Sequence, residues 1–150
     1  MSAFTDEYFM MEAINEAKKA GMEGDVPVGA IIVRGDEIIS MAHNTRENGG
    51  SAINHAEILA IDIASKQLGT WRLSDCTLYV TLEPCPMCAG AVINSRISKV
   101  VYGAKDAKAG ALGSLIDLTS YPFNHKPICI SGVLENECKN ILKDFFAKKR

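Results

Sequence analysis

The sequence contains no hydrophobic run that approaches the roughly 20 residues of a membrane-spanning helix. It also lacks a basic leader, because acidic side chains precede the first basic residue, Lys18. A secretory signal needs a positively charged start followed by an apolar stretch, and an organelle transit peptide is rich in Arg and poor in acids. We therefore expect a cytoplasmic protein with no membrane association.

Internal repeats, low-complexity tracts and linkers rich in Pro, Gly or Ser are absent as well. Apolar residues make up 47% of the chain and charged residues 23%, which excludes an intrinsically disordered protein. At 150 residues the chain has the length of one domain and can bury a core without a disulfide or a structural metal. We expect a single domain that spans residues 1–150.

Net charge is small, at −2, which argues against a uniformly basic nucleic-acid-binding protein. The charge is nevertheless divided unevenly along the chain. Residues 1–75 hold 6 basic and 12 acidic side chains, a net charge of −6, whereas residues 76–150 hold 10 and 6, a net charge of +4. A total of −2 can therefore conceal a basic face on an otherwise acidic surface.

Apolar periodicity predicts the secondary structure, with Gly21 and Gly69 as helix stops and Gly35-Asp36 as a hairpin turn. Helices are expected at residues 5–20, 55–68, 87–96 and 136–148, with a weaker one at 114–118, and strands at 28–33, 37–43, 77–82, 99–102 and 128–133. Continuous apolar strands such as 28–33 fit a sheet that is covered on both faces. The order of elements predicts an α/β protein, namely a three-layer α/β/α sandwich with a five-stranded mixed sheet.

Two short motifs place metal-binding residues at the starts of predicted helices. Cys85-x-x-Cys88 follows a predicted strand, and His55 follows a polar loop. In a reducing compartment the cysteine spacing indicates metal or redox chemistry rather than a disulfide framework. One imidazole and two thiolates suit Zn²⁺, and a fourth position left open for water is typical of catalytic zinc. Helix N-termini also favour the thiolate form of cysteine.

Glu57 follows His55 by two positions, so the two side chains need not bind one metal together. A carboxylate close to a metal but not bound to it can take a proton from a metal-bound water and pass it to a leaving group. The combination of His-x-Glu with Pro-Cys-x-x-Cys is the signature of zinc-dependent nucleobase deaminases, and the motifs around His55 and Cys85 resemble it.

Over nearly its whole length the chain resembles the bacterial tRNA-specific adenosine deaminases, whose fold is similar to that of cytidine deaminase. The segments that carry the resemblance are His43-Asn44, His55-Ala56-Glu57, Trp71-Arg72-Leu73, 77–90, Ser95-Arg96-Ile97, 101–110, Asn124-His125 and Phe145-Phe146 before Lys148-Lys149-Arg150.

This resemblance implies a homodimer that converts adenosine-34, the wobble base of a tRNA anticodon, to inosine by hydrolysis with release of ammonia. It implies one Zn²⁺ per subunit on His55, Cys85 and Cys88. Hydroxide generated at the zinc would attack C6 of adenine, and Glu57 would carry the protons to N1 and to the leaving group. The partner subunit would help to form the RNA site. The expected substrate is the anticodon stem-loop of tRNA-Arg with anticodon ACG.

Candidate substrate contacts follow from the same resemblance. Asn44 resembles the base-reading amide of the family, Val28 is expected in the pocket wall, and His55 is expected to stack on the base. Asp106 either binds a ribose hydroxyl or caps a turn. The expected substrate-binding residues are Val28, Asn44, Arg46, Ala56, Arg72, Asp106, Lys108 and Asn124.

Other polar and aromatic residues have two interpretations. The basic side chains are solvated surface charges unless they flank one cleft, where they would bind phosphates. Phe145 and Phe146 pack in the core or in an interface, unless one of them stacks on a base. His43 is expected to be a histidine with satisfied hydrogen bonds, and His125 to be a loop histidine. The basic residues in question are Arg46, Arg72, Lys105, Lys108, Lys148, Lys149 and Arg150.

Two alternatives concern the metal motif. A purely structural zinc site would need a fourth Cys or His. Cys76, Cys129 and Cys138 lie in apolar stretches, where they are expected to pack as small hydrophobic side chains. A thioredoxin-like redox pair at Cys85 and Cys88 would leave the His-x-Glu motif without an explanation.

A third alternative concerns the substrate. A small-molecule deaminase that acts on free guanine, cytosine or a nucleoside would have the same zinc motif, so the motif does not separate it from an RNA-editing enzyme. The basic second half of the chain, with Lys105 and Lys108 in the loop 103–110, favours RNA. The sequence thus predicts a basic rim around one zinc pocket.

Overall fold

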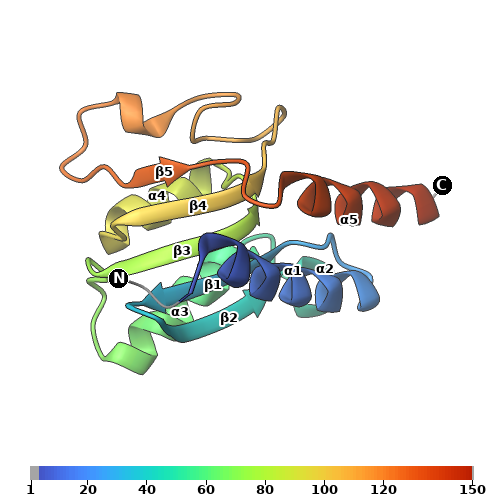
Figure 1. The fold of residues 1–150 in the computed structure, drawn as a ribbon, viewed down its shortest axis with the longest axis horizontal. Helices are drawn as coiled ribbons and strands as arrows, with labels where there is room; N and C mark the ends of the chain where they lie inside the picture. Colours follow the sequence, from blue (N-terminus) through green and yellow to red (C-terminus); the bar gives the residue numbers. More distant parts are fainter. Residues whose placement is uncertain (1–3, 150) are drawn as a thin grey trace.

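A mixed sheet forms the middle layer of the protein in the computed structural model, which describes residues 4–149 (Figure 1). Its strands, in the spatial order β2-β1-β3-β4-β5, are β1 (Gly29–Arg34), β2 (Glu37–His43), β3 (Cys76–Leu82), β4 (Lys99–Ala104) and β5 (Ile128–Ile130). β1 pairs antiparallel with both β2 and β3, whereas β3, β4 and β5 run parallel. The carboxyl ends of β3 and β4 therefore lie at the same edge of the sheet.

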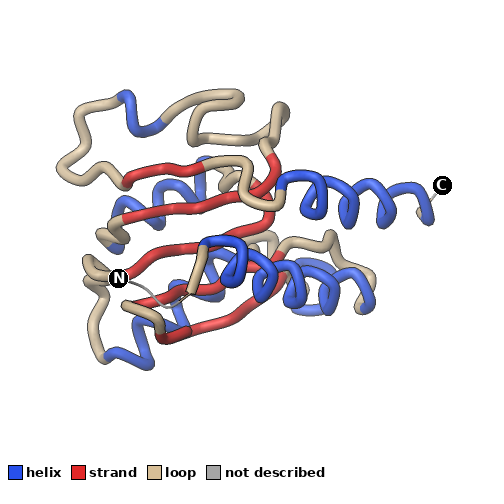
Figure 2. The backbone as a smooth tube through the Cα atoms, in the orientation of Figure 1, coloured by secondary structure: helices blue, strands red, loops and turns tan. Residues whose placement is uncertain are grey.

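Helices cover both faces of this sheet (Figures 1 and 2). The helical elements are α1 (Asp6–Met22), α2 (Arg46–Gly49), α3 (Ala56–Leu68), α4 (Pro86–Ser95), the 3₁₀ turn η1 (Leu118–Ser120) and α5 (Glu135–Lys148). α1 and α5 pack on one face, and α3 and α4 on the other. This arrangement confirms the predicted α/β/α sandwich with its five-stranded mixed sheet. Within the described residues, no helix combines the length and the hydropathy needed to cross a membrane.

The continuous apolar run in β1 serves two hydrophobic cores. Ala30 and Ile32 point into the core beneath α3 and α4, and Ile31 and Val33 into the core beneath α1 and α5. Because successive side chains of a strand point to opposite faces, a strand buried on both sides needs apolar residues at every position. The continuous apolar run in the sequence therefore indicates that β1 lies in the centre of the sandwich.

Gly29 allows α1 to pack directly on the sheet. A Cβ atom at this position would lie 2.0 Å from the carbonyl oxygen of Ala13 and 2.5 Å from the backbone nitrogen of Ala17. Both alanines are fully buried, so a small helix face meets a backbone without a side chain. The loop 23–28, which joins α1 to β1 just before Gly29, supplies Val26 and Val28 to the lining of the cavity described below.

One predicted helix boundary and one predicted helix were wrong. α1 does not stop at Gly21 but continues to Met22, and the chain turns at Gly24, which has a positive φ of 86°. The predicted helix at 114–118 is absent, because Gly113 donates to the carbonyl of Ile116 in a tight loop and only the η1 turn follows. The segment between β4 and β5 is accordingly mostly loop (Figure 2).

Two further differences concern short elements. The polar loop expected before His55 contains the single-turn helix α2. β5 pairs with β4 only over Ile128–Ile130 rather than 128–133, and Gly132 with its positive φ of 83° then redirects the chain into α5.

His43 links α1 to β2 as a satisfied histidine. Its Nδ1 lies 3.1 Å from the carboxylate of Glu16, and its Nε2 lies 3.0 Å from that of Glu23. Lys19 donates to the same Glu16 at 2.6 Å. Burial raises the pKa of Glu16, but the hydrogen bonds from Lys19 and His43 outweigh burial and bring the pKa below its ordinary value of 4.5.

We expect this link to stabilise the fold less in acid. Because the pKa of Glu16 is lower in the folded than in the unfolded chain, its contribution is present above about pH 4.5 and is lost as the pH falls through the folded pKa. Urea unfolding of wild type and Glu16→Gln should differ in free energy at pH 6 and converge toward pH 3. Glu37→Gln, an exposed site in β2, is the control. A difference that does not vary with pH would contradict the assignment.

Candidate functional site

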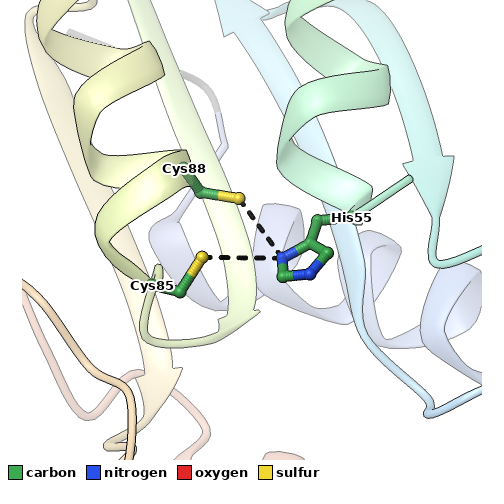
Figure 3. A group of neighbouring side chains, drawn as sticks. All are labelled: His55, Cys85 and Cys88. Atoms are coloured by element: carbon green, nitrogen blue, oxygen red, sulfur yellow. Dashed lines mark hydrogen bonds between the residues drawn. The ribbon is translucent and has the colours of Figure 1, made fainter. Parts of the chain in front are cut away.

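The starts of two helices meet beside the carboxyl end of β3. His55 occupies the N-cap position of α3, and Cys85 occupies the N-cap position of α4. Pro86 stands at the first helical position of α4, where its fixed φ favours the helix and its missing N–H leaves no donor unpaired. One turn into α4, Cys88 points back toward His55 (Figure 3). The predicted donors therefore come together in space.

These three side chains have the spacing of a metal site. The Nδ1 atom of His55 lies 3.6 Å from the Sγ of Cys85 and 3.5 Å from the Sγ of Cys88 (Figure 3). Tetrahedral zinc with ordinary Zn–N and Zn–S bonds separates an imidazole nitrogen from a thiolate sulfur by about 3.6 Å. All three donor atoms lie within 4.8 Å of one another. The donor set and its geometry thus fit Zn²⁺ without rearrangement.

Within residues 4–149, no further Cys, His or carboxylate joins this group, so the protein supplies three donors. Cys76 and Cys138 are buried elsewhere, and Cys129 is partly buried against the core on the α3 side. This placement agrees with their predicted role as small hydrophobic side chains. A site with three protein donors leaves the fourth tetrahedral position free for a water molecule.

The local electrostatics favour a cation. Hydrogen bonds from Cys88 and then from His55 outweigh burial and lower the pKa of Cys85 to about 3, so its sulfur is a thiolate at neutral pH. The same bond to Cys85 raises the pKa of Cys88, because the proton of Cys88 is held by a thiolate. A metal cation that binds here replaces that shared proton.

Glu57 lies in the first turn of α3, beside these donors but outside their group. Only 4% of the residue is exposed, and this burial raises the pKa of its carboxyl to about 7. A carboxyl group with a pKa near the working pH can both accept and donate a proton. Its burial and raised pKa are compatible with a general acid–base residue, and the catalytic role of Glu57 stays a prediction.

A cavity of about 190 Å³ opens over the group. Four of the expected substrate contacts line it, namely Val28, Asn44, Arg46 and Asp106. Its remaining lining residues are Val26, His55, Glu57, Leu82, Glu83, Cys85 and Ala109. A space of this size holds one nucleobase, not a stacked pair, which is the geometry of a pocket for a single extruded base.

Asn44 and Ala56 hold the start of α3 in place. The side-chain oxygen of Asn44 accepts a hydrogen bond from the N–H of Ala56 at 2.8 Å, and its nitrogen donates to the carbonyl of Val26 at 3.1 Å. Val26 uses only one of the two amide hydrogens of the Asn44 side chain. Ala56 is fully buried and does not line the cavity, so its contribution is the N–H that orients Asn44.

Asp106 caps a turn, which is one of the two roles expected for it. Its Oδ1 accepts hydrogen bonds from the N–H groups of Lys108 at 3.0 Å and Ala109 at 3.2 Å. The residue also lines the cavity, so the turn it caps forms part of the cavity wall. Lys108 itself is exposed and lines a neighbouring cavity together with Lys105 and Asp106.

Arg72 and Asn124 do not reach this cavity. α3 spans about 20 Å from His55 to its far end, and Arg72 lies beyond that end, with its guanidinium 5.0 Å from the ring of Trp71. Asn124 is exposed beside His125, whose Nε2 bonds the carbonyl of Ile97 past the far end of α4. The contact of Arg72 and Asn124 with the substrate therefore stays a prediction that the lining of this cavity does not support.

Basic and aromatic side chains surround the cavity mouth. Arg46 and Lys149 line a neighbouring cavity of about 180 Å³, and Lys105 and Lys108 line another of about 500 Å³. Phe146 lines both and is half-exposed. The acidic residues Asp25, Glu47 and Asp106 belong to the same walls. Lys148 lines a separate cavity between α1 and α5, and Arg150 lies outside the described residues.

Two buried carboxylates in the walls had no predicted role. Asp25 accepts from the N–H groups of Glu47 at 2.9 Å and Asn48 at 3.4 Å, and so caps α2, which carries Arg46. Glu83 lines the cavity from the end of β3. The only sequence signal for Glu83 is its position two residues before Cys85, one of the predicted metal ligands.

A family model described as MafB19-like deaminase matches residues 4–150. The tRNA-specific adenosine deaminase of Bacillus subtilis (strain 168) is 57% identical over 146 residues, which cover 97% of this chain and 91% of the relative. The tRNA-specific adenosine deaminase of Streptococcus pyogenes serotype M1 is 45% identical over 144 residues, with coverage of 95% and 84%. A solved structure from studies of A-to-I editing by tRNA:A34 deaminases at the wobble position of transfer RNA has a TM-score of 0.88 and 41% identity, and covers 90% of this chain and 99% of that one.

Proposed function

The chain belongs to the MafB19-like deaminase family and to the tRNA-specific adenosine deaminases, and from this membership we propose that it deaminates adenosine at wobble position 34 of a tRNA anticodon to inosine. The single observation that carries the proposal is the group of His55, Cys85 and Cys88 beside the buried Glu57, under a cavity that fits one base. A cytoplasmic location, where tRNA is used, belongs to the same proposal.

The residues of the cavity divide the chemistry between them. A zinc ion bound by His55, Cys85 and Cys88 would lower the pKa of a bound water toward about 7 and so supply hydroxide at neutral pH. Glu57 takes the proton of the attacking water and delivers one to N1 of adenine as C6 is attacked. Glu57 then takes the proton of the new C6 hydroxyl and passes it to the amino group, so that ammonia leaves as the C6 carbonyl of inosine forms. Asn44 holds the start of α3 and presents its amide to the base.

The surroundings of the cavity support a single-stranded RNA substrate. An adenine in an anticodon loop leaves its stack at little cost, because the loop is already unpaired. Arg46, Lys105, Lys108 and Lys149 line the cavities around the mouth and supply positive charge for phosphates. Phe146 offers a half-exposed ring next to the mouth on which a neighbouring base can stack.

A homodimer is the second part of the proposal. Large apolar side chains are exposed on the isolated subunit, among them Trp71 at 58%, Leu115 at 56% and Ile128 at 65%. A partner subunit would also explain how Arg72 and Asn124, which lie far from the cavity of their own chain, contribute to RNA binding. Light scattering should give about twice the chain mass of 16.2 kDa. A monomer at micromolar concentration would contradict the dimer.

Incubation with an anticodon stem-loop of tRNA-Arg with anticodon ACG, followed by sequencing, tests the activity. We expect inosine at the wobble position and none in a stem-loop with anticodon GCG. Free guanine, cytosine and adenosine should release no ammonia. Ammonia from a free base together with an unchanged stem-loop would overturn the proposal and identify a small-molecule deaminase instead.

A further inference from the structure

Glu83 is a buried carboxylate that the chemistry above does not use. It stands at the end of β3, two residues before Cys85, and only 2% of it is exposed. Among the described residues it forms no ion pair with Lys, Arg or His. A buried charge without a counter-ion is costly unless hydrogen bonds compensate it, so the partners of this carboxylate define its role.

Its partners all belong to the loop that follows β4. Oε1 accepts from the N–H of Asp106 at 3.1 Å and from the hydroxyl of Ser114. Oε2 accepts from the N–H groups of Leu112 at 3.0 Å and Ser114 at 3.1 Å. Both carboxylate oxygens are thus occupied by donors from the two ends of one loop, residues 105–114. Charge-assisted bonds of this kind are stronger than bonds between neutral groups.

Backbone hydrogen bonds beside Glu83 also attach the loop 105–114 to the end of β3. The N–H of Glu83 donates to the carbonyl of Ala104 at 2.9 Å, and the N–H of Ala111 donates to the carbonyl of Pro84 at 2.9 Å. The loop also wraps tightly over the carboxylate at Gly110. A Cβ atom there would lie 2.4 Å from the carboxyl carbon of Glu83, so only glycine fits.

The held loop is a wall of the catalytic cavity. Asp106 and Ala109 line the cavity from this loop, and Lys105 and Lys108 line the neighbouring one. Asn44 lines the same cavity from the segment after β2. Because only Pro84 separates Glu83 from Cys85, the carboxylate fixes this wall relative to the metal donors.

We propose that Glu83 is a positioning residue for the deamination reaction, whose carboxylate holds the loop 105–114 at the distance from the metal donors that the substrate nucleotide requires. The proposal rests on the proposed function for the identity of the substrate. The attachment of the loop is independent of that identity. A carboxylate is needed because every partner is a hydrogen-bond donor. The side-chain N–H₂ group of a glutamine would face two of these donors and could not accept from them.

The test compares Glu83→Gln with wild type and with Asp117→Asn. Asp117 caps η1 farther along the same connection, by accepting from the N–H of Thr119 at 2.9 Å, and does not line the cavity. For Glu83→Gln we expect the KM for the anticodon stem-loop to rise about tenfold or more, since at least one charge-assisted hydrogen bond is lost. We expect kcat to change less than about threefold, and metal content to stay unchanged. Asp117→Asn should behave like wild type.

Hydrogen exchange gives a readout that does not depend on the substrate. The amides of Asp106, Leu112 and Ser114 should exchange faster in Glu83→Gln, whereas the amides of β3 should not. Ser114→Ala removes a single donor, the hydroxyl, so it should raise KM only a few-fold. This variant replaces Glu83→Gln in the test if Glu83→Gln does not fold. Glu83→Asp, which keeps the charge, should restore part of the loss.

The two hypotheses fail in different ways. If wild type edits the stem-loop but Glu83→Gln shows unchanged KM and unchanged loop exchange, Glu83 has no positioning role. A fall in kcat with constant KM would contradict that role as well. If wild type edits no RNA, the proposed function fails, and the exchange rates of the three loop amides still decide whether Glu83 holds the loop.

Discussion

The Glu57→Gln variant is expected to bind zinc like wild type and to deaminate its substrate about 10³-fold more slowly, within the usual range for loss of a general acid–base group. Glutamine has nearly the size and shape of glutamate, so the cavity and the fold should be unchanged. It has no ionisable proton, however, and so cannot pass one from water to N1 or to the leaving amino group. Because Glu57 lies outside the donor group, its loss removes no metal ligand.

Single-turnover rates on the anticodon stem-loop, with zinc content measured on the same sample, check this expectation. Asp62→Asn is the matched control, because Asp62 is an exposed carboxylate on the same helix. Its one ion pair within the described residues is with Lys66 at 2.9 Å. That variant should keep wild-type activity. An active Glu57→Gln enzyme would remove Glu57 from the mechanism, and one that lacks zinc would make Glu57 part of the metal site.

The group of His55, Cys85 and Cys88 could be predicted from the sequence because its geometry is largely local. Cys85 and Cys88 lie one helical turn apart, and a proline at the first helical position fixes where that turn begins. His55 likewise stands at a helix start that apolar periodicity reveals. What the pattern could not supply is the distance between the two helix starts. The sheet sets the distance between the starts of α3 and α4, because β3 connects the two helices.

The sequence predicted the secondary structure less well where long-range contacts determine the backbone conformation. Residues 114–118 have the composition of a short helix, but the N–H of Ser114 bonds to Glu83 from another part of the chain. α2 is a single turn that depends on Asp25, a residue from the loop before β1, to cap its first N–H groups. Tertiary hydrogen bonds override local propensity in both segments.

The same reason explains why the sequence assigned no role to two buried carboxylates. Asp25 and Glu83 act on backbone donors that lie more than twenty residues away in the chain, and no spacing rule connects them. Arg72 and Asn124 belong to segments that carry the family resemblance, so they were placed with the active site. Resemblance identifies such residues as candidate substrate contacts, but it does not place them in three dimensions.

The Cys85→Ala variant is expected to lose both its metal and its activity while remaining folded. Two sulfurs and one nitrogen would hold the ion, and removal of one thiolate would leave two protein donors, too few for stable binding. Without zinc, the pKa of the attacking water returns from about 7 to 15.7, so hydroxide at neutral pH falls by about eight powers of ten and turnover becomes undetectable. The two cores do not include Cys85, so the thermal midpoint should change little.

Zinc content and activity are measured together for Cys85→Ala and for Cys129→Ala, a partly buried cysteine outside the donor group. Cys129→Ala should resemble wild type in both. A strong chelator should abolish wild-type activity, and added Zn²⁺ should restore it in wild type but not in Cys85→Ala. If Cys85→Ala retained turnover without metal, the hydrolysis would have to rely on Glu57 and an ordinary water. A carboxyl with a pKa near 7 is too weak a base to deprotonate such a water to a useful extent, so this outcome would refute the whole assignment of the site.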